Sequence, residues 1–301
     1  MRLRTAALAA VLVAAAGCGS AHQSRSAGAA AGTLQGLFDK PGENVALVNG
    51  ASDFATGVVR VPFVVVTTRA QPVYRPFARV WVAESLAKRP FEQTRAGLEP
   101  IGVPGASRPA FGGVQKIYVA KLHITKPGRY WLLAEPVGGK PIQGVTILNV
   151  KARSTSPAVG TKAIPSRTPT IGTAPLKALT TRVPPDRGLL RYSVAGSLAA
   201  GAPFVLTFAT PEFCTSRTCG PVVDVVDEVR KRFAASGIRF IHVEVFRNNK
   251  PALGYNRWMR EWHLLTEPWV FLVGRDGRIK AKFEGSVSVG ELTAAVRRFL
   301  R

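Results

Sequence analysis

Residues 203–222 read PFVLTFATPEFCTSRTCGPV, and this stretch decides the fold of the C-terminal part of the chain. Residues 204–208 form a short apolar run with the length and composition of a buried strand. Cys214 and Cys219 follow with C-x4-C spacing, and a Gly-Pro dipeptide then opens a helix. Because the N-terminus of a helix favours negative charge, it lowers the pKa of nearby thiols. The stretch therefore predicts a reactive cysteine pair at a strand-to-helix junction.

The residues that follow this pair alternate between strand and helix patterns. A helix is predicted over 220–236, because its apolar residues share one face and its charges run from acidic to basic. Ser288 and Glu291 form a capping box that predicts a terminal helix. The other predicted elements are strands over 238–245, 269–273 and 279–284, a short helix over 258–263 and an Asp-Gly hairpin turn within 275–278. The expected order is βαβ, then a β-hairpin, then a final helix.

The N-terminus has the pattern of an export signal. Two arginines lie within the first four residues, and an apolar run over 6–16 is too short to span a bilayer as a mature helix. Small residues directly before Cys18 resemble a bacterial lipobox, which implies a lipoprotein signal peptide over 1–17 and lipidation of Cys18. A Ser/Ala/Gly-rich tether over 18–32 follows. An ordinary secretory signal is the alternative, and in both cases the mature protein lies outside the cytoplasm, where disulfides persist.

The composition is strongly basic. The 301 residues include 41 Lys and Arg against 18 Asp and Glu, a formal net charge of +23. Such a charge favours contact with an anionic membrane or cell-wall polymer, although an arginine-rich composition alone would also produce it. No motif combines basic and aromatic residues as nucleic-acid-binding modules do, so no nucleic acid partner is expected. The oligomeric state is left open by the sequence.

Residues 33–151 have an all-β pattern. The predicted strands are short, rich in Val, Ile, Tyr and Trp, and separated by Gly, Pro, Asn and Asp, which indicates a β-sandwich. The segment KPGRYWLL over 126–133 resembles the turn and strand of bacterial Ig-like domains, so an Ig-like sandwich is implied. A proline-rich segment over 152–188 is expected to be a linker or a strap along a domain surface. The predicted strands cover 44–48, 57–67, 77–84, 115–124, 129–135 and 145–150.

The last 113 residues, 189–301, resemble the thioredoxin family, and in particular its membrane-facing TlpA-like branch. FATPEFC, which ends at Cys214, is similar to the family's FWATWC. TEPWVFLVGRDGRI, over 266–279, is similar to the family's P-T-x-FLIDxxGxI element. The resemblance implies that Pro268 is a cis-proline opposite the cysteines and places Glu267 close to their sulfur atoms. The fold class is therefore expected to be multidomain, with an all-β Ig-like sandwich followed by an α/β thioredoxin-like domain.

The resemblance implies thiol-disulfide exchange on exported proteins at the extracytoplasmic face of the cell membrane. The chain departs from the family's C-x2-C spacing, so two alignments are open. In the favoured one Cys214 attacks and Cys219 resolves; in the other Cys219 stands in the place of the nucleophile. Glu267 is expected either to raise the thiol pKa and relay a proton or to be an exposed loop residue. Pro268 completes the expected site, and no cofactor or metal ion is expected.

Two other functions remain open at this point. The cysteines could form an inert disulfide in a binding protein that has lost redox function. The chain also resembles peroxiredoxins with the pattern TPGCTxxAC, in which Cys214 would attack peroxide and Cys219 would resolve the sulfenic acid. That pattern places Thr or Ser where this chain has Pro211, and it requires an arginine where Glu267 and Pro268 stand. Copper delivery of the Sco type is less favoured than the peroxidase, because such proteins use C-x3-C spacing and a histidine after the late strand, where this chain has none.

Overall fold

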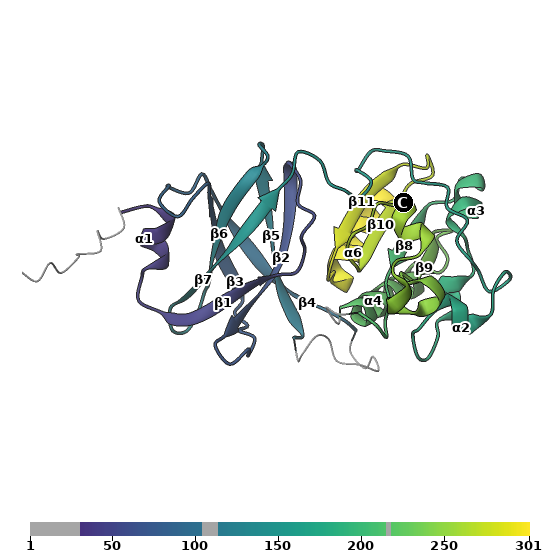
Figure 1. Ribbon diagram of the computed structural model, residues 1–301, viewed down its shortest axis with the longest axis horizontal. Helices are drawn as coiled ribbons and strands as arrows, with labels where there is room; N and C mark the ends of the chain where they lie inside the picture. Colours follow the sequence, from purple (N-terminus) through teal and green to yellow (C-terminus); the bar gives the residue numbers. More distant parts are fainter. Residues whose placement is uncertain (1–30, 104–113, 215–217) are drawn as a thin grey trace, which may run out of the picture.

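A computed structural model describes residues 31–103, 114–214 and 218–301. The described chain forms two units that lie side by side, a β-barrel from its N-terminal half and an α/β unit from its C-terminal half (Figure 1). The predicted signal peptide and Cys18 lie outside the described residues. Among the described helices, none combines the length and the hydrophobicity that crossing a bilayer requires.

The N-terminal unit is a closed barrel with the strand order β1-β2-β5-β4-β3-β6-β7. Neighbouring strands are antiparallel except β1 and β7, whose short parallel pairing closes the barrel. Apolar side chains fill its interior, where the rings of Phe63 and Tyr118 stack 5.4 Å apart. A short helix, α1, precedes the barrel. The bounds are α1 Leu34–Phe38, β1 Glu43–Asn49, β2 Gly57–Thr67, β3 Phe77–Ala83, β4 Glu92–Pro100, β5 Lys116–Ile124, β6 Gly128–Pro136 and β7 Ile142–Val150.

The prediction of a two-sheet sandwich was wrong, because it missed strand β4. This strand reads EQTRAGLEP, and Ala96 is its one buried residue, so it shows no apolar alternation. It pairs with β3 on one side and with β5 on the other, and together with the β1–β7 pairing it closes the sheet into a continuous barrel. Each of the six predicted strands overlaps an observed one.

The C-terminal unit is a four-stranded sheet with helices on both faces. The strand order is β11-β10-β8-β9, in which β8 and β9 are parallel and the other pairs antiparallel. Helices α4 and α6 cover one face, and α3 and α5 pack on the other. All residues of β8 and β10 are buried. The bounds are α2 Leu176–Leu179, α3 Val194–Ala199, β8 Phe204–Phe208, α4 Cys219–Arg232, β9 Arg239–Val243, α5 Arg257–Glu261, β10 Trp269–Val273, β11 Ile279–Glu284 and α6 Val289–Phe299, with 3-10 turns at Arg187–Leu190, Arg247–Asn249 and Pro251–Leu253.

An aromatic cluster fills the core on the α3/α5 face of this sheet. Trp262 is fully buried, with its ring centroid 5.5 Å from that of Phe208 and 4.9 Å from that of Phe271. Its indole N–H donates a hydrogen bond to the Ser166 hydroxyl, 3.0 Å away. Trp269 is also buried and stacks on Phe271. These tryptophans hold the strands that lead to the cysteines and to Pro268 in fixed positions.

The proline-rich segment 152–188 lies along the C-terminal unit as a strap. Its backbone hydrogen-bonds to the β10–β11 hairpin, where the Ala163 N–H donates to the Gly277 carbonyl at 2.8 Å. Further along, the Arg182 guanidinium donates to the Asp224 carboxylate of α4 at 2.7 Å. Leu179 of this segment is buried. The segment is therefore part of the folded surface rather than a free spacer between the two units.

Candidate redox site at the start of helix α4

The sheet register brings the cysteine loop and the loop before Pro268 together. Trp269, the first residue of β10, pairs with Phe208, the last residue of β8. The chain that enters β10 therefore lies beside the chain that leaves β8 toward the cysteines. The peptide bond between Glu267 and Pro268 is cis. Residues from two distant parts of the sequence thus meet at one edge of the sheet.

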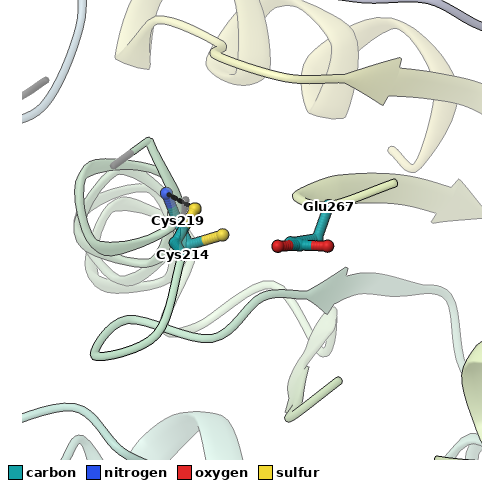
Figure 2. Close-up of side chains that lie close together, drawn as sticks. All are labelled: Cys214, Cys219 and Glu267. Atoms are coloured by element: carbon teal, nitrogen blue, oxygen red, sulfur yellow. Dashed lines mark hydrogen bonds between the residues drawn. The ribbon is translucent and has the colours of Figure 1, made fainter. Parts of the chain in front are cut away.

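The two cysteines lie next to each other at the first turn of α4, and no disulfide joins them. Cys219 is the first residue of the helix and is fully buried, whereas Cys214 is 8% exposed. The backbone N–H of Cys219 donates to the Cys214 sulfur at 3.3 Å (Figure 2). A helix N-terminal N–H that points at a sulfur stabilises the thiolate form of that sulfur. The local geometry therefore favours Cys214 as the attacking group and Cys219 as the protected one.

Glu267 faces both cysteines from the opposite side of the site (Figure 2). A carboxylate oxygen of Glu267 and the two sulfur atoms all lie within 4.8 Å of one another. The Tyr255 hydroxyl donates to Glu267 Oε2 at 2.7 Å, which fixes the carboxylate. Burial raises the pKa of the Tyr255 hydroxyl, and the negative charge of Glu267 beside it raises that pKa further. Tyr255 therefore stays a neutral donor to Glu267.

The surroundings of Cys219 shift the pKa of its thiol. Burial raises its pKa well above the ordinary value, and the neighbouring Cys214 and the Glu267 charge raise it further. The backbone N–H of Thr210 partly opposes this effect. Cys219 is therefore a protonated thiol at neutral pH, and its proton must leave before its sulfur can attack.

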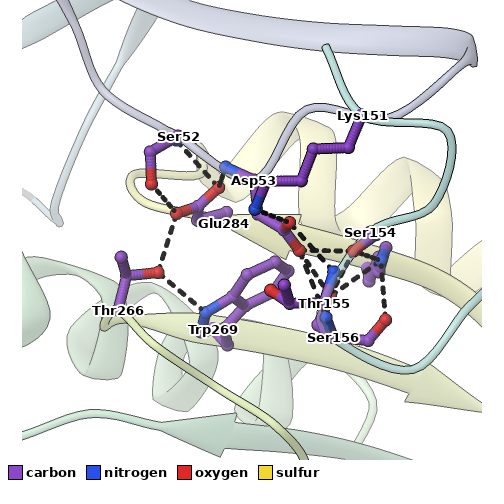
Figure 3. A network of polar contacts seen from close by, with 10 residues as sticks. Ser52, Asp53, Lys151, Ser154, Thr155, Ser156, Thr266, Trp269 and Glu284 are labelled. Carbon is purple, nitrogen blue, oxygen red and sulfur yellow. Dashed lines mark hydrogen bonds and ion pairs between the residues drawn. The ribbon is translucent and has the colours of Figure 1, made fainter. Parts of the chain in front are cut away.

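The β-barrel docks directly onto the loop that carries Pro268 (Figure 3). The Glu284 carboxylate, at the end of β11, accepts hydrogen bonds from the backbone N–H groups of Ser52 and Asp53 at 3.0 and 2.7 Å. The same carboxylate accepts from the Thr266 hydroxyl at 2.7 Å, and that hydroxyl accepts from the Trp269 indole N–H. Glu284 thus ties a barrel loop to the loop on which Glu267 stands.

Close backbone packing completes this contact. Gly285 has a φ of +73°, and a Cβ built on it would lie 2.0 Å from the carbonyl oxygen of Gly50 in the barrel. Glycine is therefore required here both for the backbone conformation and for the approach of the two units. The Arg60 guanidinium of β2 adds an ion pair to Glu291 of α6 at 2.9 Å, with both side chains 15% exposed. The barrel is consequently fixed against the α/β unit.

A groove runs between the two units beside the cysteines. Its volume is about 280 Å³, and Thr218 and Glu267 line its end next to the sulfur atoms. The barrel supplies an apolar wall on the other side. Val103, just after the barrel strand β4, packs against the hydrophobic cluster that includes both cysteines. The apolar wall consists of Val48, Pro62, Val64, Ile101, Val114 and Ile117.

The structure brings together four of the residues that the sequence singled out, namely Cys214, Cys219, Glu267 and Pro268. Cys18 lies outside the described residues. Sequence reasoning missed Tyr255 and Glu284, although both contribute to the site. Tyr255 stands in an irregular segment, and Glu284 ends a strand, so neither gave a local signal. Their roles arise from contacts between segments that are distant in the sequence.

No family model and no curated protein matches the chain. Among solved structures, the chain is similar to a thiol:disulfide interchange protein of the thioredoxin family from Chlorobium tepidum TLS. That similarity has 17% sequence identity and a TM-score of 0.31, and it covers 47% of this chain and 100% of the other. The sheet order, the cis-proline and the cysteine pair at the start of α4 define the C-terminal region as thioredoxin-like.

Replacing Glu267 with glutamine is expected to lower the pKa of the Cys219 thiol, because a neighbouring negative charge disfavours a second one. The pKa can be read from the pH dependence of Cys219 alkylation, followed by mass spectrometry. Glu212→Gln is the matched control, since Glu212 is exposed and lies two residues before Cys214. An unchanged profile in Glu267→Gln would contradict the influence of this carboxylate.

Proposed function

We propose that this protein is a thiol-disulfide oxidoreductase that acts on exported proteins at the extracytoplasmic face of a membrane, to which lipidated Cys18 anchors it. The observation that carries the proposal is the pair of adjacent thiols at the start of α4, opposite the cis-Pro268 loop. The thioredoxin-like arrangement of the sheet supports it. The anchor and the compartment rest on the signal-peptide pattern of the first 18 residues.

The chemistry proceeds in two exchanges. The Cys214 thiolate attacks one sulfur of a substrate disulfide, a mixed disulfide forms, and the other substrate sulfur leaves as a thiolate. Cys219 then loses its proton and attacks the Cys214 sulfur. The second substrate sulfur leaves, and an internal Cys214–Cys219 disulfide remains. The substrate gains two electrons and the pair loses two, and the same steps in reverse oxidise a substrate dithiol.

The surroundings of each sulfur match its proposed role. Cys214 is the more exposed of the two, and it accepts the helix N-terminal N–H that stabilises a thiolate. Cys219 is buried and holds its proton, and the Glu267 carboxylate is within 4.8 Å to accept it. Glu267 therefore acts as the proton acceptor for the second exchange, with Tyr255 orienting it.

The charge beside the cysteines distinguishes this proposal from a thiol peroxidase. Peroxidatic cysteines need a cation that stabilises the thiolate and the leaving oxygen. The structure places the Glu267 carboxylate, an anion, within 4.8 Å of both sulfur atoms. Disulfide exchange, in which a proton must be removed from the resolving thiol, is better served by that carboxylate.

The reduction potential of the pair tests the proposal. We expect the purified protein, equilibrated in thiol-disulfide buffers, to have a potential above about −300 mV and to catalyse reduction of insulin disulfides by dithiothreitol. A potential below that value, without catalysis, would indicate a structural disulfide in a binding protein. The variant lacking both cysteines, measured in parallel, provides the uncatalysed rate.

A further inference from the structure

The two thiols and Glu267 are also a set of metal ligands. We propose that the reduced protein binds one Zn²⁺ ion between Cys214, Cys219 and Glu267. Each residue offers one ligand atom, and these three atoms lie within 4.8 Å of one another. The proposal concerns an equilibrium of the reduced pair and does not depend on catalytic turnover.

The spacing of the ligand atoms suits a tetrahedral ion. Two sulfur atoms that each lie about 2.3 Å from a tetrahedral zinc are about 3.8 Å apart. The observed upper limit of 4.8 Å therefore requires the two sulfur atoms to approach each other by at most about 1 Å, within the reach of side-chain rotation. The three ligands come from two separate segments, the start of α4 and the loop before Pro268, so they approach the ion from different sides.

The donor set favours zinc over magnesium, calcium and copper(I) ions. Two thiolates exclude Mg²⁺ and Ca²⁺, which prefer oxygen ligands, and a carboxylate is a poor ligand for Cu⁺. Zn²⁺ accepts both sulfur and oxygen donors, and three protein ligands leave a fourth position for water or a further donor. The groove between the barrel and the α/β unit ends beside Glu267, and it provides the route by which an ion enters.

The neighbours of the site support a bound cation. Tyr255 donates to Oε2 of Glu267, which orients the carboxylate and leaves its other oxygen for the ion. Such outer-sphere hydrogen bonds are typical of metal-binding side chains. Two thiolates and a carboxylate this close repel one another, and a dication removes that repulsion.

Binding is an exchange of protons for metal. One Zn²⁺ replaces the protons of the two thiols, so up to two protons are released and no electron is transferred. A disulfide offers no thiolate, so the oxidised pair cannot hold the ion. Conversely, the zinc-bound pair has no free thiolate to attack a disulfide. Zinc and disulfide exchange therefore exclude each other at this site.

The test is a zinc titration of the anaerobically reduced full chain against a chromophoric zinc chelator. We expect one equivalent to bind to reduced protein and none to the oxidised pair or to Cys214→Ser/Cys219→Ser. We expect Glu267→Gln to weaken binding at least about tenfold, and the exposed Glu212→Gln to bind as the unchanged protein does. Cd²⁺ provides a second readout, because its ultraviolet thiolate charge-transfer band should appear with the reduced pair.

Equal zinc binding by the variant without both cysteines, or no binding by the reduced protein, would overturn the proposal. Equal affinity in Glu267→Gln would remove the carboxylate from the ligand set and overturn it in the form stated. Turnover is measured separately in buffer that contains chelator. Failure of exchange activity and failure of zinc binding are therefore distinct results.

Discussion

Cys219→Ser is expected to capture substrate proteins as mixed disulfides on Cys214, and Cys214→Ser is expected to capture none. Without Cys219 the first exchange still occurs, but no thiol is left to release the substrate. Without Cys214 the remaining sulfur is fully buried and protonated. Both variants should lose more than about a thousandfold in turnover, since a covalent mechanism stops when either participant is removed. Non-reducing electrophoresis of extracts that contain each variant measures the captured complexes.

The pattern of capture also decides between the two possible assignments of the cysteines. Capture by Cys214→Ser alone would assign the attack to Cys219, as in the alignment that places its CGPV sequence on the family's CGPC. Capture by neither variant would favour a binding protein without redox function. A complex that survives denaturation without a disulfide would support neither assignment of the cysteines. The variant lacking both cysteines identifies such complexes, because it forms them as well.

Asp53→Ala is expected to lower the free energy of unfolding by about 3 kcal/mol, because it leaves buried donors without their acceptor. The Asp53 carboxylate, whose side chain is 5% exposed, accepts hydrogen bonds from the backbone N–H groups of Thr155 and Ser156. It also accepts from the Ser154 hydroxyl, which in turn accepts from the Lys282 ammonium group (Figure 3). This network joins barrel, strap and sheet. Urea unfolding at pH 7 measures the loss.

A surface carboxylate provides the control for Asp53. Glu135 pairs with Arg79 on the barrel, where the arginine side chain is 48% exposed, so Glu135→Ala should cost less than about 1 kcal/mol. Hydrogen bonds from the Ser154 hydroxyl and from nearby backbone N–H groups, together with the Lys282 charge, outweigh burial and hold the pKa of Asp53 far below its ordinary value. Its stabilisation is therefore complete above the ordinary aspartate pKa of about 4 and is lost as the pH falls further. Equal costs for the two variants at pH 7 would contradict the role of the network.

The sequence predicted the α/β region well, because its signals are local. The capping box of Ser288 and Glu291 occurs as predicted. Helix α4 ends at Arg232 rather than at the predicted residue 236, and Gly237, with a φ of +73°, lies in the turn that follows. The buried strands at 204–208 and 269–273 have the predicted bounds, since their apolar runs are bordered by turn residues. The cis bond before Pro268 followed from the family resemblance rather than from any local rule.

The barrel was predicted less well for a physical reason. Strand β4 contributes one buried residue, Ala96, and is held by hydrogen bonds to β3 and β5. Pairing of this kind depends on backbone geometry and on the neighbouring strands rather than on hydrophobic alternation. Such a strand has little hydrophobic pattern of its own, so it was omitted from the prediction and the closure of the barrel was not predicted.

In the site, too, the residues within short motifs were predicted, whereas the contacts between distant segments were not. The cysteines and the residues before β10 were found from short motifs. The contacts of Tyr255 with Glu267 and of Glu284 with Ser52 join segments 12 and 232 residues apart in the sequence. Neither contact follows from periodicity or spacing, because each depends on how complete elements pack. The composition of segment 152–188 also did not predict that the barrel docks on the α/β unit, because it fitted a spacer as well as a strap.

The groove beside the cysteines has a consequence for which proteins such a site can serve. Cys214 is nearly buried, and the barrel stands fixed along one side of the groove that ends beside Glu267. A groove of about 280 Å³ has room for an extended peptide segment rather than for the surface of a compact domain. If the proposed disulfide exchange takes place here, we expect disulfides in loops, tails or incompletely folded chains to react faster than those within a finished core. On the proposed function, a rigid neighbour in this position would favour substrates whose folding is incomplete.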